Sequence, residues 1–187
     1  MKARYSLALA FAAALAAGSA AACGGAATIL GGGDAQDCSL AAIDEKSDDA
    51  SIQTCTFALI SEALSRHDRG ATFINRGVMK MRRLDFAAAL IDLDAGVRLA
   101  PEAGEGWTNR GGALIGVKRY QEGLGDINRG LALGLKQPEK AYFNRALAYE
   151  GLDDEKSAYF DYQKALALKP GWALPQHELL RFTVTPQ

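Results

Sequence analysis

The feature that most constrains this chain is a short pattern that occurs three times. An aromatic residue is followed two positions later by Asn, then by Arg, and then by Gly or Ala: FINRGVM from Phe73, WTNRGGA from Trp107 and YFNRALA from Tyr142. The likeness extends over blocks that begin at positions 70, 104 and 139, which are 34 and 35 residues apart. A period of this length predicts a stacked array of two-helix units that bury their apolar faces against one another.

Each block places small residues at the same three positions, the eighth, the twentieth and the twenty-seventh. They are Gly77, Ala89 and Gly96, then Gly111, Gly123 and Gly130, then Ala146, Ala158 and Ala165. Small residues at matched positions let two antiparallel helices approach closely, while the aromatic fourth residue fills the space between turns. Pro101 and Pro170 close two of the blocks, and we expect them to end the second helix.

Together these positions resemble the tetratricopeptide repeat, and the resemblance covers residues 70–170. It implies an all-α fold in which antiparallel helix pairs stack as a short right-handed solenoid, with repeats at 70–103, 104–138 and 139–172. The sequence departs from the family pattern in three ways. Glu155 replaces an aromatic residue, Leu135 replaces the closing proline of the second repeat, and Arg precedes the small eighth residue where the family usually has Leu.

We expect further helices at both ends, because a stacked array must cover its terminal apolar faces. Residues 47–69 are predicted to form an N-terminal helix, with Ser47 or Asp48 as its N-cap. Its apolar residues at helical spacing are Ile52, Cys55 and Leu59. Residues 173–187 are predicted to contain a short capping helix, beginning near Pro175, and a tail. This arrangement also resembles a group of small exported bacterial proteins with Asn-Arg-Gly repeats.

The first 22 residues have the features of an export signal. Lys2 and Arg4 precede an uncharged run from Leu7 to Ala17, and small residues follow it. Two routes remain open at the end of this segment: ordinary cleavage at an Ala-x-Ala site, or lipid attachment at Cys23, which resembles the acylated cysteine of bacterial lipoproteins. The glycine-rich residues 23–46 are predicted to be a flexible linker. We therefore expect an exported protein, either periplasmic or an outer-membrane lipoprotein, which touches a membrane only through such an anchor.

The two remaining cysteines and the charge agree with export. Cys38 and Cys55 lie 17 residues apart without a zinc-binding spacing, and in an oxidising compartment we expect a disulfide. The alternative is a pair of buried thiols. Loss of Lys2 and Arg4 would take the formal net charge from −1 to −3, which gives no electrostatic reason to expect a nucleic-acid partner.

The arginine of the repeated pattern has a candidate partner inside its own repeat. An aspartate follows sixteen residues later each time, as the pairs Arg76 and Asp92, Arg110 and Asp126, and Arg145 and Asp161. In a two-helix hairpin these positions can face each other, so we predict ion pairs that join the two helices and fix their register. This interpretation assigns the arginines to structure and not to ligand binding.

The asparagines Asn75, Asn109 and Asn144 are the candidate ligand contacts. In the geometry that the resemblance implies, they lie toward the concave side, where an amide can donate to and accept from a peptide backbone. The alternative is a bond to a neighbouring helix. Further candidates for the lining of the groove are Ile74, Val78, Thr108, Lys140 and Phe143, which the end helices could equally cover. Related domains that hold a terminal carboxylate need Lys at the position of Ile74, so that ligand is not expected.

The sequence carries no converging catalytic groups. His67 and His177 lie in terminal segments outside the repeats, and no Gly-x-Ser-x-Gly motif is present. We expect no enzyme activity, no cofactor and no metal. The predicted function is docking of a peptide or protein segment in the concave face, within the bacterial cell envelope. The alternative is a lipid-anchored assembly component that binds partners through other surfaces.

Overall fold

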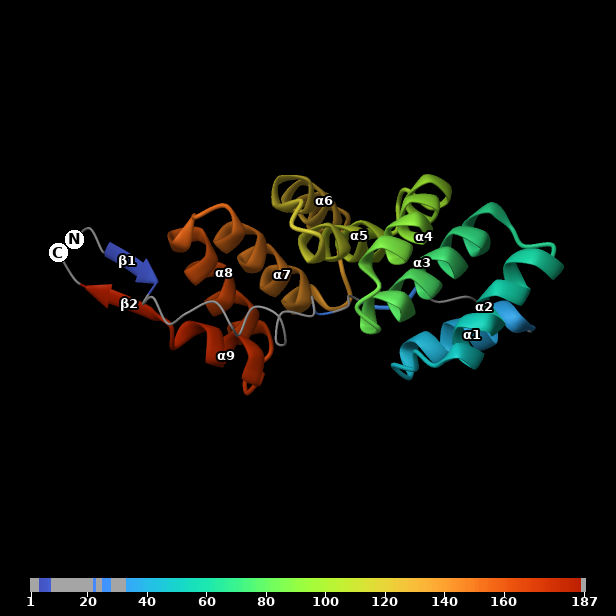
Figure 1. Cartoon of the computed structure of the whole chain (residues 1–187), viewed down its shortest axis with the longest axis horizontal. Coiled ribbons are helices and arrows are strands. Elements are labelled where there is room, and N and C mark those ends of the chain that lie inside the picture. The colour runs from blue at the N-terminus through green and yellow to red at the C-terminus, as the bar shows by residue number, and fades with distance from the viewer. Residues whose placement is uncertain (1–3, 8–21, 23–24, 28–32, 186–187) are drawn as a thin grey trace.

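The computed structural model describes residues 4–7, 22, 25–27 and 33–185. Helices follow one another along an elongated molecule, and one short two-stranded ribbon lies at the end that holds both termini (Figure 1). The helices are α1 (Asp34–Ile43), α2 (Asp49–Ser61), α3 (Arg66–Arg82), α4 (Phe86–Leu99), α5 (Gly104–Gly116), α6 (Tyr120–Leu133), α7 (Pro138–Gly151), α8 (Glu155–Leu168) and α9 (Ala173–Leu179). The strands β1 (Arg4–Leu7) and β2 (Phe182–Thr185) pair antiparallel.

The three predicted repeats are three helix hairpins, α3 with α4, α5 with α6, and α7 with α8. Within each repeat the two helices pack against each other, and each second helix also packs on the first helix of the next repeat. The first helices α3, α5 and α7 contact one another in turn, so they form one continuous layer. This layer carries the asparagines.

The small residues of the repeats lie where helices touch, as the sequence predicts. A Cβ atom at Gly130 would come within 2.2 Å of the Thr108 hydroxyl oxygen and 2.7 Å of the Gly104 carbonyl oxygen. One at Gly77 would lie 2.8 Å from the Leu93 side chain. These distances are shorter than van der Waals contact, so the hairpins close only because side chains are missing at these points.

The N-terminal region differs from the predicted linker. Residues 34–43, which fall inside the predicted flexible segment 23–46, form helix α1. Its buried residues are Ala35, Cys38, Ser39 and Ala42. They follow the i, i+3, i+4, i+7 spacing of a helix face, but they are small and follow a glycine run, so the pattern was weak in the sequence. The helix covers α2 and α3 with small side chains.

The predicted N-terminal helix at 47–69 is in fact two elements. Helix α2 ends at Ser61, and α3 already begins at Arg66, four residues before the predicted repeat boundary. Asp48 is the N-cap of α2, where its carboxylate accepts a hydrogen bond from the Ser51 amide. The Ser65 hydroxyl does the same for the Asp68 amide at the start of α3. The Ser65 cap therefore starts a new helix inside the segment that periodicity alone joined.

At the other end, α9 covers the last repeat and β2 follows it. The Trp172 ring, which immediately precedes α9, stacks on Phe143 with ring centres 5.1 Å apart. Arg181 pairs with Glu150 of α7 and, at 2.9 Å, with Glu178 of α9. Burial raises the pKa of the nearby Tyr162 hydroxyl well above its ordinary value, helped by the negative charge of Glu150.

Most of the predicted export signal lies outside the described residues, as does Cys23. Among the described parts, residues 4–7 form β1, which adds to the edge of β2. Within the described part of the chain, the helices are too short or too polar to cross a membrane.

Candidate functional site: an asparagine ladder

The three asparagines line up on the first helix of each repeat. Asn75 on α3, Asn109 on α5 and Asn144 on α7 are each 0% exposed, although a carboxamide is normally found in contact with water. Their positions agree because α3, α5 and α7 form one layer and the asparagines occupy the same place in each repeat. All three amides bind the same piece of backbone, which belongs to the N-terminal part of this chain.

Two of these contacts are reciprocal. The Asn144 side-chain oxygen accepts from the Ala22 amide at 2.9 Å, and its Nδ2 donates to the Ala22 carbonyl at 3.0 Å. In the same way, the Asn75 oxygen accepts from the Ala27 amide at 2.8 Å, and its Nδ2 donates to the Ala27 carbonyl at 2.9 Å. Each carboxamide thus satisfies both polar groups of a single residue, as a neighbouring strand would. Such a contact requires no particular side chain on the bound residue.

The middle rung is longer. Asn109 Nδ2 donates to the Gly25 carbonyl at 3.4 Å. The bound chain therefore passes from the third repeat to the first, against the order of the repeats. We call Ala22 and residues 25–27 the N-terminal strap.

The two ends of the strap are seated differently. Ala27 packs against the apolar clusters of the first repeat, and its carbonyl accepts a second hydrogen bond, from the Ser39 hydroxyl at 2.9 Å. Ala22 packs beside the apolar cluster of the third repeat, which includes Phe143. The first-repeat end is therefore held by α1 as well as by the ladder.

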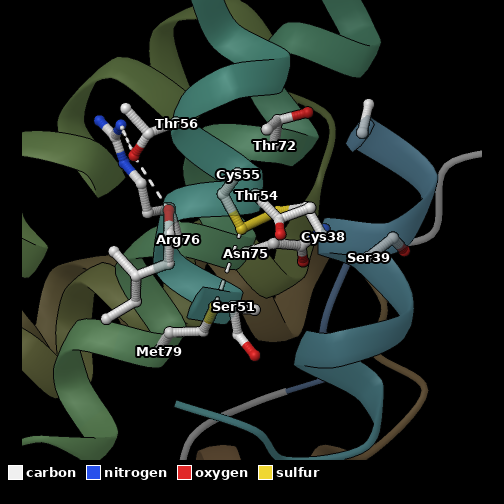
Figure 2. The surroundings of a disulfide bond; sticks show 12 residues. Cys38, Ser39, Ser51, Thr54, Cys55, Thr56, Thr72, Asn75, Arg76 and Met79 are labelled. Atoms are coloured by element: carbon white, nitrogen blue, oxygen red, sulfur yellow. Dashed lines mark hydrogen bonds between the residues drawn. A yellow bond between two sulfur atoms is a disulfide. The ribbon is translucent and has the colours of Figure 1, made fainter. Parts of the chain in front are cut away.

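Helix α1 is itself fixed by a disulfide. Cys38 of α1 and Cys55 of α2 are bonded, with Cα atoms 4.8 Å apart, and both side chains are fully buried. Figure 2 shows the bond between the two helices, with Asn75, Arg76 and Met79 of α3 beside it. The disulfide prediction is therefore confirmed, and the alternative of two separate thiols is not. Ser39, the residue next to Cys38, is the one that binds the strap.

Several predicted groove residues lie inside the helix layers instead. The Ile74 side chain fills the space at Gly96 of α4 and Gly106 of α5, and the Thr108 hydroxyl donates to the Gly104 carbonyl of its own helix. Phe143 packs on Tyr162 and on Trp172, so an end segment does cover it. These residues share the fifth position of the repeat, and their side chains are buried between helices. Their assignment to the groove was wrong for this reason.

Two other predicted residues lie nearer the strap. Val78 is fully buried in the apolar cluster against which Ala27 packs. Lys140 lines a cavity of about 260 Å³ beside the strap residues Gly25 and Ala26. Arg82 and Lys136 also line this cavity, and Glu45 is its one acidic lining residue. The cavity is therefore lined by more basic than acidic residues, and it lies beside the strap residues Gly25 and Ala26.

The arginines join helices, at the offset that the sequence predicts. Arg76 donates to both carboxylate oxygens of Asp92 at 2.8 and 2.7 Å. The other two repeats have the same two-bond geometry, Arg110 with Asp126 at 2.6 and 2.9 Å and Arg145 with Asp161 at 2.6 and 2.9 Å. The hydrogen bond to Asp126 raises the pKa of Arg110, and the bond to Asp161 does so for Arg145. Each arginine also lies over the aromatic ring three residues before it.

Each arginine has a third partner that the sequence analysis missed. Nη1 of Arg110 donates to Asp94 at 3.0 Å, and Nη1 of Arg145 donates to Asn128 at 2.8 Å. In the first repeat the partner is the Thr56 hydroxyl of α2, at 3.0 Å (Figure 2). Asp94 and Asn128 occupy equivalent positions 34 residues apart, but their chemistry differs, which hid the pattern. Each arginine thus binds the helix before its own as well as the helix after it.

Comparison with solved structures identifies the architecture. The chain superposes on the Arabidopsis OM64 TPR domain with a TM-score of 0.59 and 20% identity, over 63% of this chain and 96% of that one. A MamA double mutant gives a TM-score of 0.61 with 19% identity, over 79% and 82% of the two chains. The first TPR domain of human RPAP3 gives 0.57 with 24% identity, over 63% and 91%. The protein has the tetratricopeptide-repeat fold.

The two sequence comparisons found nothing similar to this chain. No protein-family model matches it, and no curated protein matches it. Within the described residues of the chain, no cluster of His, Cys, Asp and Glu side chains could hold a metal ion. The ladder is therefore the site that the geometry of this tetratricopeptide array brings together.

Proposed function

We propose that the concave face of this protein binds an extended segment of a protein through the segment's backbone. The observation that carries the proposal is the reciprocal contact that Asn75 and Asn144 each make with one backbone residue. Buried carboxamides with no partner would cost about 1–3 kcal/mol each, so the ladder is more stable when a backbone occupies it. The occupant in this structure is the strap.

The strap also indicates which residues fit at the rungs. Ala22, Gly25 and Ala27 present small side chains to the array where the asparagines bind. Ala27 lies between clusters that include Ala35 and Ala71, which leaves little room there for a larger side chain. We infer that a partner carries small residues at the rung positions and varies between them.

The cavity beside Ala26 offers a place for one larger side chain. Arg82 and Lys140 lie on its wall with Lys136, and Glu45 is its acidic member. Opposite charge favours binding at such a site. We infer that a partner with Asp or Glu at the position of Ala26 binds more tightly than the strap sequence does.

Solved relatives of the fold support a protein segment as ligand. One RPAP3 domain was solved with the HSP90 peptide SRMEEVD, and another with the HSP70 peptide SGPTIEEVD. Both peptide sequences end in Glu-Val-Asp, and a clamp for a terminal carboxylate would need Lys. Here the position that would need Lys is Ile74, whose side chain is buried between helices. We therefore propose an internal segment of a partner and not its C-terminus.

We further propose that the protein acts after export, in the periplasm or on the outer membrane with Cys23 as a lipid anchor. A buried disulfide between Cys38 and Cys55 supports an oxidising compartment. The second candidate function is a structural component of an envelope assembly. It is favoured by exposed apolar side chains on the outer helices, such as Phe57, Ile60 and Ile91.

The test is a titration with a fluorescein-labelled peptide, AAASGGAATI, which copies residues 20–29 with Ser in place of Cys23. The protein is the full chain, and the titration extends to millimolar concentrations because the strap competes. Asn75→Leu, Asn109→Leu and Asn144→Leu together should weaken binding at least tenfold. Asn128→Leu, which removes an amide on the outer helix α6, should leave it unchanged. Equal affinity of the triple variant and the wild type would refute the proposal.

A further inference from the structure

The ladder is filled by the chain itself across all three repeats. Ala22, Gly25 and Ala27 occupy Asn144, Asn109 and Asn75 in that order, at sequence separations of 122, 84 and 48 residues. A partner segment that uses the same amides must displace these residues. Displacement must begin at one end of the strap, and the inference below rests on the backbone-binding function proposed above.

The two ends of the strap are not equally held. At the first repeat, the Ala27 carbonyl accepts from both Asn75 and Ser39, and Ser39 lies on a helix that the disulfide bonds to α2. At the third repeat, the polar contacts of Ala22 within the described residues are those with Asn144 alone. The strap is therefore held by more hydrogen bonds at the Asn75 end than at the Asn144 end.

We propose that the N-terminal strap is a built-in competitor of the partner, fastened at Asn75 and released at Asn144, so that a partner segment enters the groove at the third repeat. The strap is part of the chain, so its local concentration at the ladder is on the order of millimolar. The apparent affinity for an external segment is the intrinsic affinity multiplied by the fraction of molecules in which the strap is released. Loosening Ala22 alone is enough to open the third-repeat rung.

The predicted export cleavage falls at this releasable end. Both routes, Ala-x-Ala cleavage and lipoprotein processing, hydrolyse the peptide bond after Ala22. A signal peptidase catalyses this step with one water, whose hydroxyl joins the Ala22 carbonyl carbon and whose hydrogen joins the nitrogen of residue 23. Ala22 then leaves with the signal, and Asn144 loses its occupant while Ala27 remains at Asn75. Processing by either route would therefore open the same rung.

A proline substitution in the full chain tests the proposal, because proline lacks the amide that each rung accepts. Ala22→Pro removes the donor to Asn144. Asn128→Leu on α6 is the control, because it leaves every ladder contact in place. The probe is the labelled AAASGGAATI peptide. Ala22→Pro should bind it about tenfold more tightly than the wild type does, and Asn128→Leu should remain within about twofold of the wild type.

A second readout follows the strap directly. The Ala22 and Ala27 amides, which donate to Asn144 and Asn75, should exchange slowly in the wild type. In Asn144→Leu the Ala22 amide should exchange faster, while the Ala27 amide should still exchange slowly. If the wild type binds the probe as tightly as Ala22→Pro, and both lose binding with Asn144→Leu, the strap is not a competitor, although the ladder still binds peptide. If neither protein binds the probe at millimolar concentration, the proposed function fails and this inference fails with it.

Discussion

Arg110 on α5 donates a hydrogen bond of 3.0 Å to Asp94 on α4, and so joins the second repeat to the first. The same guanidinium donates twice to Asp126 within its own repeat. The exposure of the two acceptors differs, since the Asp94 side chain is 60% exposed and that of Asp126 is 12% exposed. One arginine therefore takes part in a surface pair and in a largely buried pair.

This difference predicts an order of stability losses. Asp94→Ala should lower the free energy of unfolding by no more than about 1 kcal/mol, because exposed pairs contribute little. Arg110→Ala should cost about 3 kcal/mol, because it leaves the Asp126 carboxylate buried without its cation. Urea unfolding measures both changes. If Arg110→Ala leaves stability unchanged while Asp126→Ala lowers it, the pair is not what holds the hairpin.

Alanine substitutions at two glycines of helix α6 are expected to change stability in opposite directions. A Cβ at Gly130 would meet the Thr108 hydroxyl at 2.2 Å, whereas one at Gly125 meets nothing within 4 Å. Gly130→Ala should therefore destabilise the protein by about 1–3 kcal/mol through overpacking. Gly125→Ala should stabilise it by about 0.5–1 kcal/mol, because alanine is the better helix former. Equal effects on the unfolding midpoint would contradict the close approach of α5 and α6.

The disulfide should contribute to stability and to strap seating. Replacing Cys38 and Cys55 by Ala should lower the free energy of unfolding by about 3 kcal/mol, since the bond closes a loop of this size. Because α1 carries Ser39, the residue 27 amide should also exchange faster in this variant. Calorimetry with and without dithiothreitol gives the control: reductant should shift the wild type and leave the variant unchanged.

The cavity beside Ala26 predicts a charge-dependent gain. In Ala26→Glu the new carboxylate enters the cavity that Arg82 and Lys140 line. The strap should therefore bind more tightly to the ladder, and the hydrogen exchange of the Ala27 amide should be several-fold slower. Ala26→Gln is the matched control and should lack the gain. The gain should also shrink as salt rises, because screening weakens partly exposed pairs. A gain of equal size with Gln would show that added volume, and not charge, is responsible.

Periodicity explains what the sequence could predict. The hairpins, the small contact residues and the Arg–Asp offset recur at fixed spacing, so each repeat supports the interpretation of the others. Helix α1 lies outside the repeats, so the spacing of its small buried residues could not be checked against a second copy. Ile74 was misplaced because the fifth position of the repeat faces helices. The hydrogen bonds between Ala27 and Asn75 could not be predicted, because a contact with the backbone of a residue 48 positions away leaves no pattern of side chains in the sequence.

The direction of the strap determines how the chain responds to mechanical force. Its rungs run from Asn144 to Asn75 toward α1. In the uncleaved chain, a pull at Ala22 that is directed away from the helix layer loads the Asn144 rung first and the Asn75 rung last. Rungs that are loaded in series open at low force. The peeling stops at Ala27, because the chain beyond it leads into a helix held covalently by Cys38 and Cys55. A pull in this direction would thus open the groove and leave the helical array intact.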